Sequence, residues 1–427
     1  MRVPQPSIRR IVNNPDLILS YCVFCDLLNG RKMKVILRKN KEKYLTRGYP
    51  WVFSNIIDAV EDNPGTGDIV DISDASGSHL GCGLYNATSA IAVRFLSHRR
   101  AADVSDDLFR ERVRDAISFR DQTMPGLTHR RLIYGESDGL PGLVIDQYGD
   151  VITWSCLSAG MEMRRDILLD ELRTLIRPSA VVERNDVQLR VKDGLEERTG
   201  VIEGTLPTPV RIEEDGVSFD VDILNGPKTG FFIDQRPNRL ASRTLARGRS
   251  VLDPFCADGG FGLHAAYAGA ARVLMGDISA AAVERATHNA EINNLQAVTQ
   301  IERRNALDWL GLLAEAGERF DMIILDPPAF AKSKRNLDDA TRSYQRLNIT
   351  ALQILEPGGI LATSSCSQAL SETDFLKIVH YSARKADRRL RLLHRGAGSP
   401  DHPVLSSMPD TDYLKFYIFQ IVGDHCP

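Results

Sequence analysis

The chain has 427 residues, of which 43% are hydrophobic and 26% charged, and its formal net charge is −3. This length predicts two or three domains, and the charge excludes a polycation, so nucleic acid would have to bind to local basic patches. The seven cysteines follow no framework spacing, and Cys22 and Cys25 form a lone C-x-x-C pair. We therefore expect no disulfide scaffold, no metal site and a cytoplasmic location. No apolar run has the length of a membrane span, so no membrane partner is expected.

Residues 1–32 are polar, contain three prolines and show no periodic pattern. We expect this extension to be disordered or a misannotated start, with a fully active chain beginning at Met33.

Residues 33–105 are predicted to form a small β-barrel, because short strand-like runs alternate with Gly and Asp turns. These runs are Val35–Leu37, Ile69–Ile72, Leu80–Tyr85 and Ile91–Phe95. From Arg31 to Arg47 there are eight Lys and Arg residues and one acid, and aromatic residues follow. Charge suits phosphate and rings suit bases, so this surface is predicted to bind RNA. The predicted contacts are Lys34, Arg38, Arg47 and Trp51, although Trp51 taken alone fits a core residue better.

Residues 106–215 are predicted to contain a connecting helix, within Ala101–Thr123, and a small α+β domain. Leu143–Gln147 and Val151–Cys156 flank a turn and predict a hairpin, and Met161–Ile176 predicts an amphipathic helix. Two further strands, Val181–Arg184 and Val210–Glu213, would complete the order strand-strand-helix-strand-strand. No titratable constellation is evident there, so we interpret this domain as a spacer.

Residues 216–427 predict an α/β domain. The segment Lys228–Arg236, K-T-G-F-F-I-D-Q-R, opens a helix, and from Ser250 strands alternate with helices. Such alternation is typical of a parallel, doubly wound sheet.

The most informative stretch is Val251–Ala266, V-L-D-P-F-C-A-D-G-G-F-G-L-H-A-A, which predicts a strand end, a tight turn and a helix. Gly259, Gly260 and Gly262 allow positive φ and close approach of a ligand to the backbone. An acid at the tip of the next strand, Asp277, suits two ribose hydroxyls. The stretch predicts a nucleoside-binding crevice, and by itself it leaves a dinucleotide and S-adenosylmethionine as alternatives.

Two more strand ends carry chemistry, at the edge of the sheet where ligands bind. Asp326 begins D-P-P-A-F, in which Pro327 and Pro328 fix a rigid loop that can hold a flat base, with Phe330 available for packing. Cys366 follows the next strand among serines. A thiolate there could add to carbon 6 of a pyrimidine and make carbon 5 nucleophilic enough to accept a methyl group.

These segments carry a family resemblance. D-P-F-C-A-D-G-G-F-G, T-G-F-F-I-D-Q-R, D-P-P-A-F-A-K-S-K, S-S-C-S and, from Tyr134, Y-G-E-S-D-G-L-P-G-L-V-I-D resemble the bacterial large-subunit rRNA cytosine-5 methyltransferases. The resemblance extends from about Met33 to the C-terminus. It implies an N-terminal PUA domain, a small α+β central domain and a C-terminal class I, Rossmann-like methyltransferase domain.

The resemblance implies S-adenosylmethionine as methyl donor and 23S rRNA, or a large-subunit assembly particle, as partner; a homodimer stays open. It implies Cys366 as the nucleophile, and the D-P-P loop adds Asp326 as a second predicted catalytic residue. The predicted cofactor contacts are Asp253, Gly259, Gly260, Gly262, Asp277, Asn305, Gln235 and Arg236, and those for the base are Pro327, Pro328 and Phe330. Asn305 stands where an Asp usually meets adenine. Gln368 stands where His is more usual, which removes a possible proton relay.

Two other functions stay open. A guanine-nitrogen methyltransferase can also carry a D-P-P motif and needs no cysteine. A non-catalytic RNA-binding assembly factor could retain the fold, although complete motifs at every strand end argue against it.

Overall fold

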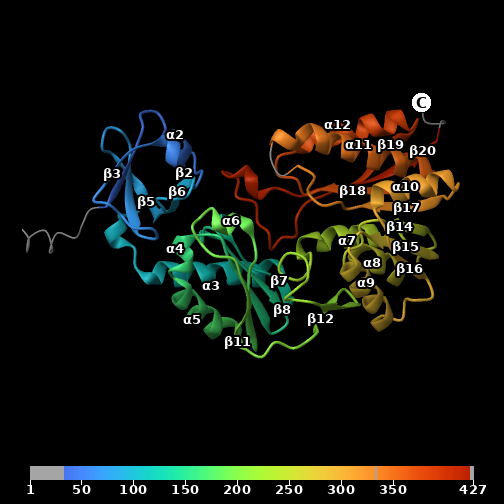
Figure 1. Cartoon of the computed structure of the whole chain (residues 1–427), viewed down its shortest axis with the longest axis horizontal. Helices are drawn as coiled ribbons and strands as arrows, with labels where there is room; N and C mark the ends of the chain where they lie inside the picture. Colours follow the sequence, from blue (N-terminus) through green and yellow to red (C-terminus); the bar gives the residue numbers. More distant parts are fainter. Residues whose placement is uncertain (1–32, 332–333, 424–427) are drawn as a thin grey trace, which may run out of the picture.

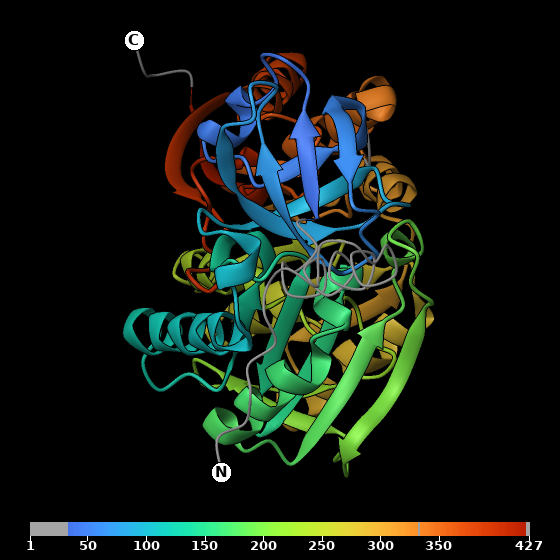
Figure 2. The same ribbon diagram turned by 90° about the vertical axis from the view of Figure 1, so that its left-hand side faces the viewer.

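The computed structural model describes residues 33–331 and 334–423 (Figure 1), so the extension predicted for residues 1–32 lies outside the described part of the chain. Three units follow one another along the sequence. The N-terminal sheet lies above the central unit in both views (Figures 1 and 2), and the C-terminal unit packs against the central one.

The N-terminal unit is one six-stranded sheet in the order β2-β6-β5-β4-β1-β3. Residues of β1, β2, β4 and β6 share one buried cluster, so the sheet is rolled around its core. Two strands escape prediction, because β2 has three residues and four of the five residues of β3 are exposed. The strands are β1 (Lys34–Leu37), β2 (Trp51–Phe53), β3 (Ile57–Glu61), β4 (Ile69–Ser73), β5 (His79–Tyr85) and β6 (Ile91–Ser97).

The central unit is a five-stranded sheet in the order β11-β10-β9-β8-β7. The predicted hairpin is confirmed as β8 and β9, which pair antiparallel. The elements are α3 (Asp106–Thr123), β7 (His129–Tyr134), β8 (Leu143–Tyr148), β9 (Val151–Cys156), α4 (Ala159–Glu162), α5 (Arg165–Ile176), β10 (Ala180–Asn185), α6 (Gln188–Val191) and β11 (Arg198–Gly204).

The predicted strand order of the central unit is wrong. Strand β7 begins H-R-R and lacks an apolar pattern because its arginines are buried in ion pairs, and β11 is a half-exposed edge strand. The segment predicted as the last central strand is β12 (Val210–Glu214), which pairs only with β13 (Val217–Val221) in a two-stranded sheet. This hairpin spans the proposed domain limit at 215/216.

The C-terminal unit is a seven-stranded sheet in the order β16-β15-β14-β17-β18-β20-β19, with the first five strands parallel. Its strands are β14 (Ser250–Asp253), β15 (Arg272–Asp277), β16 (Thr299–Arg303), β17 (Phe320–Leu325), β18 (Leu355–Ser365), β19 (Arg389–Gly396) and β20 (Lys415–Val422). Its helices are α7 (Arg236–Arg243), α8 (Gly260–Tyr267), α9 (Ala280–Ile292), α10 (Ala306–Glu315), α11 (Leu337–Ile354) and α12 (Glu372–Lys385).

Helices cover both faces of this sheet. Val251 packs in the core that holds α8 and α9, whereas the next residue, Leu252, packs in the core that holds α10 and α11. The doubly wound prediction is therefore confirmed. The chain order reverses between β14 and β17, and this is the point where ligands bind in such sheets.

A buried charged cluster ties the hairpin and the central unit to the C-terminal sheet. Glu214, at the end of β12, accepts hydrogen bonds from Nε and Nη2 of Arg239, both at 2.6 Å. His264 Nε2 lies 3.0 Å away, and His129 Nε2, from β7, lies 3.9 Å away. Burial alone would raise the pKa of Glu214, but Arg239 and His264 more than offset it and hold that pKa well below its ordinary value.

Glu214→Ala leaves a buried guanidinium without its partner, so the free energy of unfolding should fall by about 3–5 kcal/mol. Because the folded-state pKa of Glu214 is depressed, its contribution is present above about pH 4.5 and is lost as the pH falls further. Urea unfolding at pH 7 tests the magnitude and an acid series tests the sign. Glu318→Ala removes an exposed ion pair with Arg272 and serves as control; an equal effect of both substitutions would contradict this role.

Candidate active site

A cavity of about 460 Å³ opens at the carboxyl ends of β14, β15 and β17, at the reversal of strand order. Nine of the predicted site residues line it: Gln235, Gly260, Asp277, Asn305, Asp326, Pro327, Pro328, Phe330 and Cys366. The tertiary structure thus brings together residues that are up to 131 positions apart (366 − 235).

Asp253, predicted to contact the cofactor, lies behind the turn and does not line the cavity. Its carboxylate is fully buried and accepts the backbone N–H of Phe255 at 3.3 Å and of Gly262 at 3.1 Å. Burial raises the pKa of Asp253 to about 7. Asp253 therefore shapes the turn from beneath.

Two of the three glycines also act on the turn's shape. Gly259 has φ +88° and precedes α8, and an added Cβ would meet Leu263 at 2.7 Å. A Cβ on Gly262 would lie 2.1 Å from Met275 Sδ, so this glycine allows helix α8 to approach β15. Gly260 lines the cavity itself.

Two backbone donors hold the Asp277 carboxylate at the cavity, where the sequence predicts a contact with ribose. Its Oδ2 accepts the backbone N–H of Ala257 at 3.1 Å, and its Oδ1 accepts that of Ser279 at 2.9 Å. Each oxygen keeps a further lone pair for a hydroxyl donor. Ala257, which supplies the first of these N–H groups, lines the cavity together with Asp277. The acid and the turn are therefore placed to bind one nucleoside.

Of the remaining predicted cofactor residues, Asn305 lines the cavity and Arg236 does not. The Oδ1 of Asn305 caps helix α10 by accepting the N–H of Leu307 at 3.0 Å. Arg236 points elsewhere, because its Nη2 pairs with Asp215 Oδ2 at 2.9 Å outside the cavity lining.

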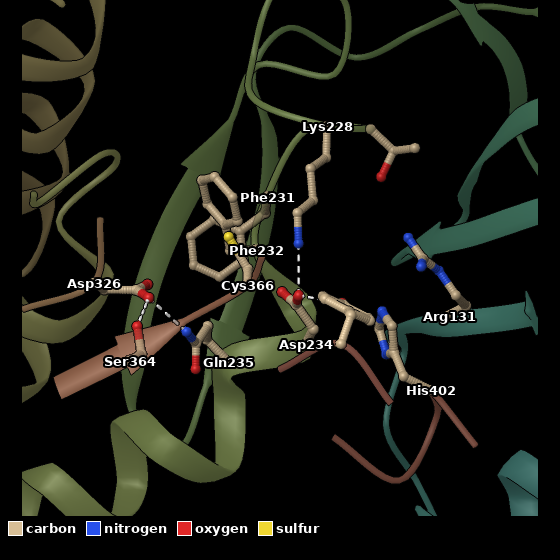
Figure 3. Close-up of polar contacts among 12 residues, drawn as sticks. Arg131, Lys228, Phe231, Phe232, Asp234, Gln235, Asp326, Ser364, Cys366 and His402 are labelled. Atoms are coloured by element: carbon tan, nitrogen blue, oxygen red, sulfur yellow. Dashed lines mark hydrogen bonds and ion pairs between the residues drawn. The ribbon is translucent and has the colours of Figure 1, made fainter. Parts of the chain in front are cut away.

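Asp326 is fixed from two sides. Its Oδ1 accepts Gln235 Nε2 at 2.7 Å and the hydroxyl of Ser364 (Figure 3). Asn238 Nδ2 donates to Gln235 Oε1 at 2.6 Å and so orients the amide. Burial raises the pKa of Asp326 to about 6, with the nearby Asp234 charge adding to the effect. Gln235, predicted as a cofactor contact, lines the cavity and orients the Asp326 carboxylate.

Cys366 is half-buried at the end of β18 and lines the same cavity. Its Sγ lies 3.9 Å from the carbonyl of Pro327, which places the thiol against the D-P-P loop. Burial and the charge of Asp326 raise the pKa of this thiol to about 11. The other described cysteines, Cys82, Cys156 and Cys256, are buried.

Lys228 and Asp234 are among the lining residues that escaped prediction. Lys228 Nζ donates to Asp234 Oδ2 at 2.6 Å, and both lie beside Cys366 (Figure 3). Both belong to the segment K-T-G-F-F-I-D-Q-R, but nothing in its spacing shows that Lys228 folds back onto an acid six residues later.

The predicted RNA contacts lie in the N-terminal unit, away from the cavity lining. Trp51 Nε1 donates to Glu136 Oε1 of the central unit at 2.7 Å, so its indole bridges two units. Lys34 pairs with Glu61 at 3.5 Å, and Arg38 Nε donates to the carbonyl of Ile57 at 3.0 Å. Arg47 is exposed.

Across residues 33–331 and 334–423, no helix is both long and apolar enough to cross a membrane. In the same part of the chain, no group of three His, Cys, Asp or Glu side chains is placed to hold a metal ion.

Comparison with known proteins matches residues 35–98 to a PUA-like domain and residues 196–417 to the S-adenosylmethionine-dependent methyltransferases. Ribosomal RNA large subunit methyltransferase I of Aeromonas hydrophila is 44% identical over 386 residues, which cover 89% of this chain and 97% of that protein. The same-named protein of Photobacterium profundum is 42% identical over 388 residues, with the same coverage. The chain belongs to this methyltransferase family.

The fold agrees with solved relatives. A putative S-adenosylmethionine-dependent methyltransferase from Streptococcus mutans superimposes with a TM-score of 0.77 at 21% identity, over 91% of this chain and 100% of that one. A putative methyltransferase complexed with SAH gives 0.78, also at 21% identity, with the same coverage. The predicted PUA-like domain, methyltransferase domain and cofactor, S-adenosylmethionine, are confirmed.

Asp277→Ala should weaken S-adenosylmethionine binding by on the order of 1.5–3 kcal/mol, because charge-assisted hydrogen bonds to the ribose are lost. The fold should persist, since Asp277 accepts only two backbone donors at a strand tip. Calorimetry measures the affinity, with Glu318→Ala as surface control. Native affinity in Asp277→Ala would reject the ribose assignment.

Proposed function

We propose that this methyltransferase makes 5-methylcytosine in 23S rRNA of the large ribosomal subunit through a covalent adduct with Cys366. The observation that carries the proposal is the meeting of Cys366 and Asp326 in one cavity with the turn and Asp277. The names of the relatives, ribosomal RNA large subunit methyltransferase I, support a ribosomal RNA substrate.

Carbon 5 of cytosine is a weak nucleophile while the ring is aromatic, so the adduct is needed to activate it. The sulfur of Cys366 bonds to carbon 6 while Asp326 gives a proton to ring N3, and the proton that leaves the thiol replaces the one on Asp326. A carboxyl group with a pKa of about 6 can exist in both states near neutral pH. The result is an enamine with its electron pair on carbon 5.

S-adenosylmethionine supplies the electrophilic methyl group that this electron pair takes. A base then removes the carbon-5 proton, the freed pair restores the ring double bond, and the carbon–sulfur bond breaks with its electrons on sulfur. The N3 proton returns to Cys366. The rigid Pro327–Pro328 loop and Phe330 keep the base flat against the cavity wall, with Asp326 at its polar edge.

The two alternatives are weaker. Methylation of a guanine nitrogen has no use for a thiol beside the D-P-P loop. A non-catalytic assembly factor has no use for a carboxyl group held by Gln235 and Ser364 at the cofactor cavity.

Cys366→Ala should abolish methylation yet leave cofactor and RNA affinity nearly intact, because a transition-state interaction is removed. Transfer of labelled methyl groups to rRNA measures activity, and mass spectrometry identifies the nucleoside. With 5-fluorocytosine in the RNA, the native enzyme should be trapped covalently, since fluorine blocks the final elimination, and Cys366→Ala should not be trapped. Cys156→Ala, at a buried position outside the cavity lining, is the matched control for the trap. Substantial methylation by Cys366→Ala would make the guanine alternative the better one.

The exposed basic stretch of the N-terminal unit should dock RNA without affecting chemistry. Reversing Lys43 and Arg47, both exposed, should raise the Michaelis constant for RNA and reduce the slope of its salt dependence by about two, one per charge. Turnover at saturating RNA should hold. Lys377→Glu, an exposed change on α12, is the control. A fall in turnover with unchanged RNA affinity would contradict a docking role.

A further inference from the structure

Lys228 has an unusual backbone conformation. Its φ is +53°, in the left-handed region that side chains other than glycine rarely adopt. Such a conformation costs about 1–3 kcal/mol and persists only where surrounding contacts impose it, often at functional sites. The reaction proposed above does not use Lys228, so it does not explain this backbone conformation.

The central unit contacts the turn that carries Lys228 through the next residue, Thr229. The Thr229 hydroxyl donates to Asp146 Oδ2 and lies 3.0 Å from the hydroxyl of Tyr148, and both partners belong to β8. Asp146 is itself held by Arg131 of β7, whose Nε and Nη2 donate to its two oxygens at 2.7 and 2.9 Å. The turn that carries Lys228 is thereby anchored to the neighbouring unit, which is not a spacer.

The anchored side chain reaches the catalytic cavity. Its Nζ pairs with Asp234 Oδ2 and lies 4.8 Å from the ring centre of Phe232 (Figure 3). The side chain is 35% exposed and lines the cavity that Cys366 lines. Asp234 is 2% exposed, and its Oδ1 has no hydrogen-bond partner among the described residues.

The other cations that line the cavity pair with acids outside its lining, whereas Lys228 pairs with Asp234, which lines it. Arg239 is held by Glu214, and Arg304 Nε donates to Glu302 at 2.8 Å. Lys415 Nζ, on β20 behind the thiol, donates to the carbonyls of Ser367 and Tyr413.

The charged and titratable groups that act on Cys366 from the surrounding elements are few. Asp326 and Asp234 raise its pKa and Lys228 lowers it, whereas Lys415 and the Tyr344 hydroxyl also interact with it. Since burial already raises the pKa of this thiol, a cation is needed for the thiolate to form.

We propose that Lys228 is a positioning residue for the nucleophile, whose ammonium stabilises the Cys366 thiolate, and that the central unit holds it there through Thr229. This rests on the proposed role of Cys366. On this proposal, the hydrogen bonds from Arg131 to Asp146 and from Thr229 to Asp146 hold the Lys228 ammonium in position from the neighbouring unit.

The test is the pH profile of Cys366 alkylation by iodoacetamide in the full chain, followed by mass spectrometry of the peptide that contains Cys366. Lys228→Met should raise the pH of half-maximal alkylation by about one unit, which is about tenfold slower alkylation below it. Lys228→Arg should stay within about twofold of native, and Lys377→Met is the surface control. An unchanged profile in folded Lys228→Met would overturn the proposal.

Asp234→Asn separates charge from structure. Removing this acid leaves Lys228 charged, so the profile should move to lower pH, opposite to Lys228→Met. If the substitutions merely loosened the site, alkylation would be faster in both Lys228→Met and Asp234→Asn. A shift of the pH of half-maximal alkylation in the same direction in both variants would overturn the proposal. Circular dichroism and S-adenosylmethionine affinity verify that each variant is folded.

Thr229→Val tests the anchoring. It should shift the profile in the same direction as Lys228→Met, by a smaller amount, and reduce turnover without changing the Michaelis constant for RNA. A native profile in Thr229→Val would refute the role of the central unit. Failure here is distinct from failure of the proposed function, because 5-fluorocytosine trapping by the native enzyme tests Cys366 independently of Lys228.

Discussion

A buried carboxylate is costly unless hydrogen bonds or an opposite charge compensate it, and this constraint shapes the C-terminal unit. Each of its four central acids meets the constraint differently. Asp253 accepts backbone donors, Asp326 accepts neutral side-chain donors, and Asp234 and Glu214 face cations. The environments separate their pKa values: burial raises that of Asp253 to about 7 and that of Asp326 to about 6, whereas cations hold the other two low.

This separation divides the acids by role. Acids paired with cations stay charged and hold segments together, as Glu214 does for β12, α7 and α8. Asp326, compensated by neutral donors at the cavity wall, has a pKa raised to about 6, and under the proposed function it is the acid that exchanges a proton. Asp253, which is fully buried whereas Asp326 is partly exposed, lies outside the cavity lining and holds the turn through two backbone N–H groups.

Acids also make the contacts between units. Glu136 of the central unit binds both Trp51 and Arg94 of the N-terminal sheet, and Tyr49 donates to Asp410 Oδ2 of the C-terminal unit at 3.1 Å. The aromatic residues that suggested base stacking are thus committed partly to other units. Under the proposed function, RNA docks on the exposed cations of the N-terminal unit, such as Lys43 and Arg47, which lie far along the chain from the cavity.

Much of the fold could be predicted because parallel strands are apolar runs and the turns between them carry glycine or proline. The residues that end or follow these strands at the cavity, Gly260, Asp277, Asp326 and Cys366, could be predicted from this pattern, since parallel strands bring their carboxyl ends to one edge. Strands β7 and β11 could not be predicted this way, because one buries paired arginines and the other is a half-exposed edge.

The residues at and after the strand ends follow from the sequence pattern, and with them the cavity and the candidate nucleophile. Their contacts depend on the tertiary structure. Asp253 and Arg236 lie outside the cavity lining, Gln235 donates to Asp326, and Lys228 lines the same cavity as Cys366. The physical reason is that these roles depend on partners from other segments: Thr229 is anchored by Asp146, 83 residues earlier, and no local pattern records such a pairing.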